Sequence, residues 1–144
     1  MKTHEEVQQI ERKLRDLFAG EADDFRPFAV FDERLDCIRV TVRQCSVVET
    51  RINDLLTVLE DNYEEPGPGR YVGFTIKGPK YFCITHGLPG SGPVRLTEIL
   101  DKIVAVYPEP VVQLVVNVIA RPMIKEQEAE IGTVVLTGPV PQAA

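Results

Sequence analysis

The chain has 144 residues, of which 44% are hydrophobic and 26% charged, and its net charge is −6. A chain of this length and composition is expected to form one globular domain with its own core rather than a disordered segment. The acidic balance disfavours nucleic-acid binding, which relies on basic side chains against phosphates.

Other overall features predict a soluble protein of a reducing compartment. The N-terminal residues are not followed by the apolar region of a signal peptide. The most apolar run, residues 111–120, is too short to span a bilayer. Cys37, Cys45 and Cys83 are odd in number and widely spaced, as expected for reduced thiols. We therefore expect a cytoplasmic protein that does not enter the membrane.

A helix is predicted over residues 4–19. Apolar side chains recur there at intervals of three and four, and charged side chains occupy most other positions. Gly20 follows at a place where a glycine often ends a helix. The apolar positions are Val7, Ile10, Leu14, Leu17 and Phe18.

Residues 28–31 and 37–43 predict a β-hairpin. The first segment is a short apolar run, and in the second apolar and polar side chains alternate, as on a strand with one buried face. The polar residues 32–36 between them are expected to form the connection.

Residues 46–63 fit either a helix or a strand. Ser46 and Glu49 have the spacing of a helical capping box, and the apolar residues after them fall on one helical face. Residues 55–59 also resemble a strand that follows a turn at Asn53. Local pattern alone favours neither alternative.

An internal similarity bears on the same choice. Residues 51–66 align without gaps on residues 95–110, with identical residues at five positions. A duplicated strand–strand–helix unit would explain this match and would make 47–62 a helix. A chance similarity is the other interpretation.

Further elements are expected in the second half of the chain. Residues 71–77 alternate as a strand, 81–85 form a second strand or a short helix, and 88–93 form a loop. A helix is predicted from residue 94 or 97 to residue 106, where a proline-rich stretch stops it.

The last part of the chain is expected to form strands. Residues 111–120 are rich in β-branched side chains and predict a strand that is buried on both faces and ended by Pro122. Residues 133–136 predict a last strand.

Together, these elements predict an α+β fold. It comprises an antiparallel sheet, a meander of hairpins, with the N-terminal helix and the helix near 94–106 packed on it. One domain is expected over residues 1–137, followed by a flexible tail, 138–144, that contains two prolines.

Residues 31–77 contain a pair of aspartates four positions apart, then a Glu-Thr dipeptide, then a Val-Gly-aromatic-x-Ile strand. The residues are Asp32, Asp36, Glu49, Thr50, Val72, Gly73, Phe74 and Ile76. In this order they resemble a family of short, uncharacterised, mostly bacterial antiparallel-β proteins known as a domain of unknown function. The resemblance implies a meander and a strand at 54–60, and it implies no enzymatic activity. Residues 62–69 form a longer turn than that family has.

The sequence contains no recognisable catalytic or metal centre. Cys83 and His86 have the spacing of half a zinc site, but such a site needs three or four protein ligands. A Cys83 or Cys45 nucleophile with His86 as its base would also need an orienting group, which no motif marks. The acidic residues within 60–65 lack the spacing of a calcium loop and favour a solvated turn. We therefore expect no catalytic residue, metal or cofactor.

The glycine-rich residues 87–92 offer one alternative function, the binding of an anion, a phosphate or another small molecule, with or without catalysis. Free backbone N–H groups before a helix bind phosphate, but no Lys-Ser/Thr pair follows here and Pro93 removes one donor. A purely structural loop is the simpler interpretation. The residues of such a ligand site would be Tyr81, His86, Gly90, Ser91 and Arg95.

A polar face of the predicted sheet is the other candidate surface. It comprises Arg39, Thr41, Arg43, Tyr71, Thr75 and Lys77. Such a mixture suits a protein–protein or anion-binding surface, although an ordinary solvated face is the simplest interpretation. A third alternative is nucleic-acid binding through Arg39, Arg43 and Lys77.

Our leading hypothesis from the sequence is a non-enzymatic binding or assembly module. We expect it to act as a homo-oligomer, in the simplest case a homodimer, and it could also bind another protein. The apolar segment 111–120 would form the interface if it is not central in the sheet.

Overall fold

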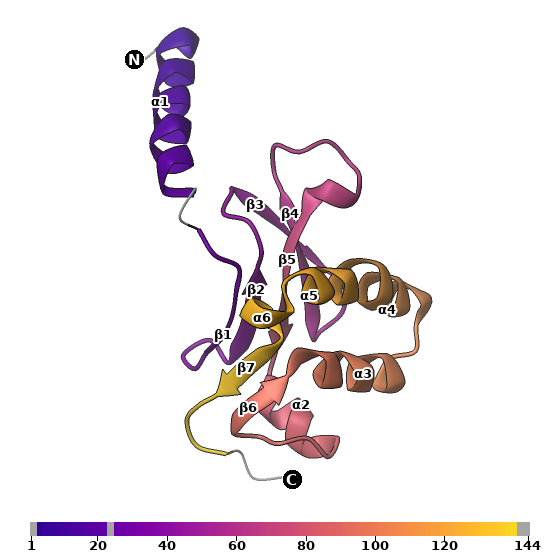
Figure 1. Cartoon of the computed structure of the whole chain (residues 1–144). Coiled ribbons are helices and arrows are strands. Elements are labelled where there is room, and N and C mark those ends of the chain that lie inside the picture. The colour runs from indigo at the N-terminus through magenta and orange to yellow at the C-terminus, as the bar shows by residue number, and fades with distance from the viewer. Residues whose placement is uncertain (1–2, 23–24, 141–144) are drawn as a thin grey trace.

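A computed structural model describes residues 3–22 and 25–140, with the side chains of 15–22 excepted. It shows an α+β fold in which a five-stranded antiparallel sheet is covered on one face by helices (Figure 1). The order of the strands is β1-β2-β5-β4-β3. They are β1 (Phe28–Asp32), β2 (Cys37–Thr41), β3 (Val47–Arg51), β4 (Leu56–Asp61) and β5 (Tyr71–Lys77).

Two hairpins flank β5, which lies between β2 and β4. In the β1–β2 turn, Asp32 Oδ1 accepts hydrogen bonds from the backbone N–H groups of Arg34 and Leu35. Asp36 ends this turn in a left-handed conformation, with φ of 47°. The two aspartates of the hairpin therefore have structural roles, because short polar side chains suit both positions.

Residues 47–61 form a hairpin of two strands, and the helix that a duplication would require is absent from them. Asn53 Oδ1 accepts hydrogen bonds from the N–H groups of Leu55 and Leu56, which closes the turn between β3 and β4. The matching segment 95–110 contains a helix instead. The helical alternative for 47–62 is therefore wrong: Leu56 and Val58 of β4, two residues apart, both enter the core, as on a strand.

The helical layer contains α3 (Leu96–Val106) and a long continuous helix from Pro110 to Glu126. The long helix comprises α4 (Pro110–Leu114), the π-helical segment η2 (Val115–Ala120) and α5 (Arg121–Glu126). These helices pack on the apolar face of the sheet. Fully buried core side chains come from both layers and include Ile38, Val40, Phe74, Ile76, Leu96, Ile99, Leu100, Ile103 and Val116.

The expectation of a strand at 111–120 is wrong. The buried positions along the long helix are 112, 115, 116, 120, 123 and 124, which is the spacing of one helical face. The β-branched composition of this segment suggested a strand, but packing against the sheet overrides that weak preference.

Pro122 also lies inside this helix, where the sequence predicted a stop. The N–H of Arg121 bonds to the carbonyl of Val116, five residues earlier, so the helix widens into a π turn just before the proline. Proline has no N–H and its ring would clash with the carbonyl four residues before it. A π turn changes this local geometry, and the helix continues past Pro122.

Three short elements complete the body: α2 (Pro79–Thr85), the 3-10 turn η1 (Pro68–Arg70) and α6 (Glu128–Ile131). A second, two-stranded sheet pairs β6 (Gly92–Arg95) with β7 (Thr133–Leu136). The predicted strand at 133–136 is confirmed, whereas the sequence predicts a loop and the start of a helix where its partner β6 lies. The pairing joins segments about forty residues apart, so no local pattern indicates it.

Helix α1 (His4–Ala22) extends two residues beyond Gly20 and projects away from the body (Figure 1). Thr3 and Glu6 form a capping box at its start: each backbone N–H donates to the other side chain, at 3.2 and 3.3 Å. Within the described residues, α1 does not pack extensively on any other element. In the same part of the chain, no helix has the length and apolarity needed to cross a membrane.

Candidate interaction surfaces

The apolar side of α1 is exposed. Val7, Ile10 and Leu14 retain 40%, 39% and 46% of their accessible surface. Their spacing of three and four residues aligns them along one side of the helix. An isolated helix of about this length is marginal in water, and most helical stability in proteins comes from packing of an apolar side. We call this row the α1 stripe.

A second apolar row lies on the outer side of the long helix. Val111, Leu114 and Val118 are 48%, 59% and 62% exposed, although their neighbours at 112, 115 and 116 are buried. Their spacing of three and four residues places them on the side opposite the core. We call this row the outer stripe.

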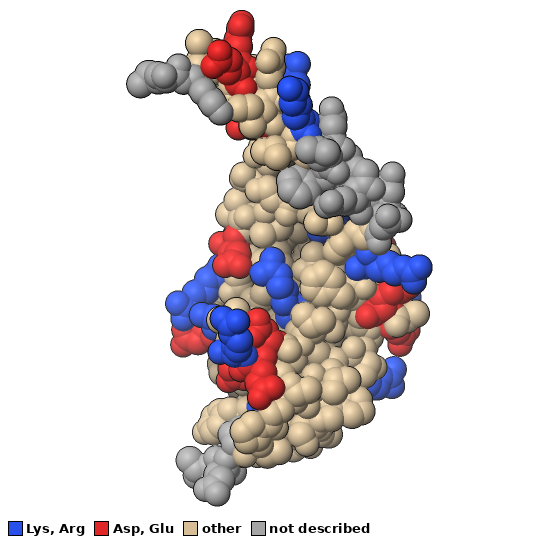
Figure 2. All heavy atoms as spheres, turned by 90° about the vertical axis from the view of Figure 1, so that its left-hand side faces the viewer, with Lys and Arg blue, Asp and Glu red and all other residues tan. Residues whose placement is uncertain are grey.

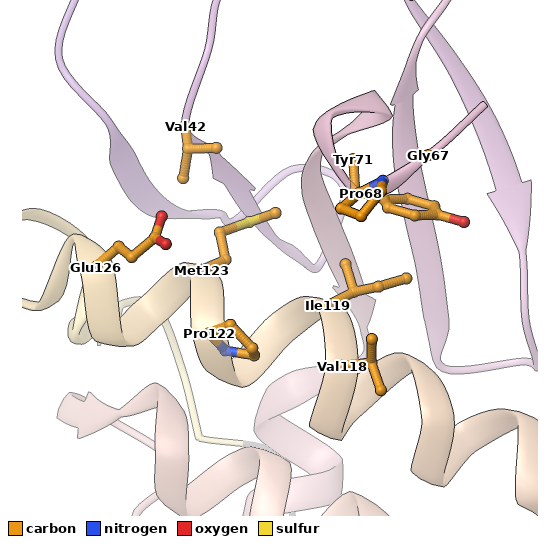
Figure 3. Close-up of a pocket in the computed structure, with 9 residues that line it drawn as sticks. All are labelled: Val42, Gly67, Pro68, Tyr71, Val118, Ile119, Pro122, Met123 and Glu126. Atoms are coloured by element: carbon orange, nitrogen blue, oxygen red, sulfur yellow. The ribbon is translucent and has the colours of Figure 1, made fainter. Parts of the chain in front are cut away.

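A groove adjoins the outer stripe at the end of the sheet where β2 ends and β5 begins. It has a volume of about 460 Å³ and lies between η2 and α5 on one side and the end of β2 and the turn before β5 on the other. Figure 3 shows Ile119 and Met123 directed from the helix toward the sheet, with Val42 and Tyr71 on the opposite wall. The lining residues are Val42, Gly67, Pro68, Tyr71, Val118, Ile119, Pro122, Met123 and Glu126. The lining is mostly apolar, and Glu126 is its one charged member.

A β-bulge brings Tyr71 into this groove. Leu59 lies opposite Gly73, but the next residue, Glu60, lies opposite Tyr71, so β5 has one extra residue at this point. A one-residue change in register moves the following side chains to the other face of the sheet. Tyr71 therefore leaves the polar face on which the sequence placed it and packs toward the helices.

Four of the expected polar-face residues do share one side of the sheet. Arg39 lies opposite Thr75, and Lys77 opposite Cys37, while Thr41 follows two residues after Arg39 on the same face. Thr41 and Thr75 are only 8% exposed, so they contribute little surface.

Two of the basic side chains on and beside this face, Arg39 and Arg43, have acidic neighbours. Arg39 lies 3.9 Å from Glu49, and Arg43 lies 2.7 Å from Asp61. On the side of the body seen in Figure 2, below α1, basic and acidic side chains are interspersed rather than separated into patches. A surface of mixed charge binds the phosphate backbone of a nucleic acid less favourably than a continuous basic surface does.

The proposed ligand-site residues are distributed over several elements. The His86 ring packs on Phe82, with their ring centres 4.6 Å apart. Arg95 forms an ion pair with Glu128 at 3.5 Å, and a side chain at Gly90 would meet Ile84. Ser91 is exposed in the loop before β6. Tyr81 lines a pocket of about 380 Å³ that the other four do not line.

Lys80, which the sequence analysis did not single out, is the one buried residue among those that line this pocket. It is 6% exposed, and its ammonium donates hydrogen bonds to the backbone carbonyls of Thr137, at 2.7 Å, and Pro139. The same ammonium lies 5.9 Å from the centre of the Phe31 ring. Lys80 therefore holds the segment after β7 against α2; the last part of the expected tail, 141–144, lies outside the described residues.

The three cysteines are free thiols with raised pKa values. Burial raises the pKa of Cys83 to about 11, and burial also raises the pKa values of Cys37 and Cys45. A nucleophilic cysteine needs the opposite shift, because the thiolate is the reactive form.

Two carboxylates of the 60–65 segment, those of Glu60 and Asp61, have partners at the end of the sheet. Glu60 lies 3.4 Å from Arg70, and Asp61 accepts hydrogen bonds from Arg43 and from the N–H of Tyr63. Across the residues that the structure describes, no three potential metal ligands of the His, Cys, Asp and Glu types come together.

No protein-family model, no curated protein and no solved structure shows significant similarity to this chain.

Proposed function

We propose that this protein is a non-enzymatic assembly module that acts as a homodimer. The observation that carries the proposal is the exposed α1 stripe on a helix that projects from the body. The outer stripe supports it, because large exposed apolar surfaces of soluble proteins are typical of interaction sites. A dimer would remove both stripes from water.

The compartment in which it acts is part of the same proposal. All three cysteines are free, and Cys83 is buried in the core. Free, buried thiols are typical of proteins in reducing compartments. We infer that the module works in the cytoplasm.

Sedimentation and light scattering test the homodimer. At micromolar concentration the wild-type protein should have twice the mass of one chain, and Leu14→Asp should give the mass of one chain, because a carboxylate in the α1 stripe cannot be buried against an apolar partner. Leu14 is 46% exposed, so this change leaves the core of the body intact.

Leu35→Asp is the matched control. Leu35 is the most exposed large apolar residue among those described, at 72%, and lies in the β1–β2 turn. This variant should retain the wild-type mass. A wild-type protein that stays monomeric up to high micromolar concentration would exclude the proposal.

A further inference from the structure

We infer that α1 of one copy packs on the outer stripe and groove of a second copy, so that two copies exchange their N-terminal helices. This inference rests on the proposed homodimer and specifies its interface. The contact is isologous: each copy contributes one helix and receives one.

The two apolar rows match in length. By sequence, α1 has apolar residues at 7, 10, 14 and 17, and the body has exposed or groove-lining apolar residues at 111, 114, 118 and 122. Each row spans about three helical turns, or roughly 16 Å. An antiparallel alignment places Val7 against Pro122 and Ile10 against Val118 of the other copy.

Charge and helix dipoles bear on the direction of the contact. In the antiparallel direction Glu5 and Glu6 come close to Lys125 and also to Glu126, which lines the groove, whereas in the parallel direction they come close to Glu109. All five of these side chains are exposed, and Figure 2 shows acidic side chains gathered at the free end of α1. The antiparallel direction also places the two helix dipoles in opposition, which is favourable.

Charge also disfavours the simplest rival, a pair of α1 helices. If all four apolar positions of two α1 helices are matched in an antiparallel pair, Lys13 faces Lys13 and Glu11 faces Glu11 of the other copy. In a parallel pair, Glu6 faces Glu11. Residues beside the apolar seam set partner choice in paired helices, and both arrangements bring like charges together.

The position of α1, which we call the arm, and the size of its contact with the second copy are compatible with exchange. Phe28, the first residue of β1, lies opposite Thr41 of β2. Val42, which follows Thr41, lines the groove. The chain thus enters β1 beside the groove of its own body. The two arms together would bury on the order of 1,200 Å² of accessible surface, which is the lower end of the range for stable, specific interfaces.

Two variants test the exchange, one in each partner surface. Ile10→Asp alters the arm, and Val118→Asp alters the receiving surface at a residue that is 62% exposed. Each variant alone should raise the dissociation constant of the dimer about 30-fold or more, which is the effect expected at a central interface residue. Leu35→Asp should leave it unchanged.

Mixing the two variants gives the decisive measurement. A mixed dimer keeps one intact contact, between the arm of the Val118→Asp chain and the groove of the Ile10→Asp chain. Fluorescence energy transfer between labelled chains should therefore appear in the mixture and not within either variant alone. If Val118→Asp alone remains fully dimeric, the homodimer stands and the exchange is wrong. If wild-type chains are monomeric, with α1 folded on its own groove, both are wrong.

Discussion

Arg43 and Asp61 connect two strands that do not pair with each other: Arg43 Nη2 lies 2.7 Å from Asp61 Oδ2, just beyond β2 and at the end of β4. The strand β5 separates β2 from β4 in the sheet. Arg43 also donates to the carbonyl of Gly69, in the turn that leads into β5. The pair therefore fixes three chain segments at the end of the sheet that borders the groove.

Asp61→Asn should reduce the free energy of unfolding at pH 7 by about 1–2 kcal/mol, the contribution of a partly buried, charge-assisted hydrogen bond. The N–H of Tyr63 and the Arg43 guanidinium hold the pKa of Asp61 below its usual value. A carboxylate with a lowered pKa contributes stability above its unfolded pKa of about 3.9 and loses it as the pH falls further. The difference between wild type and variant should therefore shrink below about pH 4 in urea unfolding series.

Asp54→Asn is the control for this experiment. Asp54 also pairs with an arginine, Arg51, but its side chain is 96% exposed. An exposed pair contributes little, so this variant should unfold like the wild type across the pH range. A difference between wild type and Asp61→Asn that stays constant down to pH 2 would contradict the assignment to the carboxylate.

Gly73→Ala should destabilise the sheet by about 1–3 kcal/mol or more, as overpacking does. An added Cβ would stand 2.1 Å from the carbonyl oxygen of Val40 on β2 and 3.1 Å from Leu59 Cδ1 on β4. The nearer atom belongs to the backbone and cannot move without disturbing the β2–β5 pairing. Gly69→Ala, where nothing lies within 4 Å of the new Cβ, should be close to neutral in the same thermal unfolding measurement.

Lys80→Met should release the segment after β7. The variant leaves two backbone carbonyls without the ammonium donor, which costs about 1–3 kcal/mol for each if they stay buried. We expect the segment to detach instead, with faster amide exchange and earlier proteolytic cleavage near Thr137. Lys77→Met, at an exposed lysine of β5, should preserve the wild-type pattern.

Cys83 should resist alkylation in the folded protein. With a pKa of about 11, only on the order of one thiol in a thousand is ionised at pH 8, against roughly a quarter of free cysteines. Iodoacetamide followed by mass spectrometry should label Cys83 slowly at pH 8 and quickly in urea. Equal rates in both conditions would show that the thiol is not buried as described.

Much of the fold follows from local sequence patterns. Period-two alternation identified the first hairpin and β5, and spacings of three and four identified α1 and α3, because each pattern states which side of one element is apolar. The free cysteines and the turn at Asn53 could likewise be predicted from residue types. The homodimer and the ligand-site residues remain predictions that the structure does not test.

Tertiary structure decided what depends on contacts between distant segments. Residues 111–126 are helical because their buried side chains pack on a sheet that other parts of the chain form. Likewise, β6 pairs with a strand about forty residues away. The bulge that turns Tyr71 into the groove depends on the register between β4 and β5. Composition and spacing describe one segment at a time, and packing partners and register are properties of pairs.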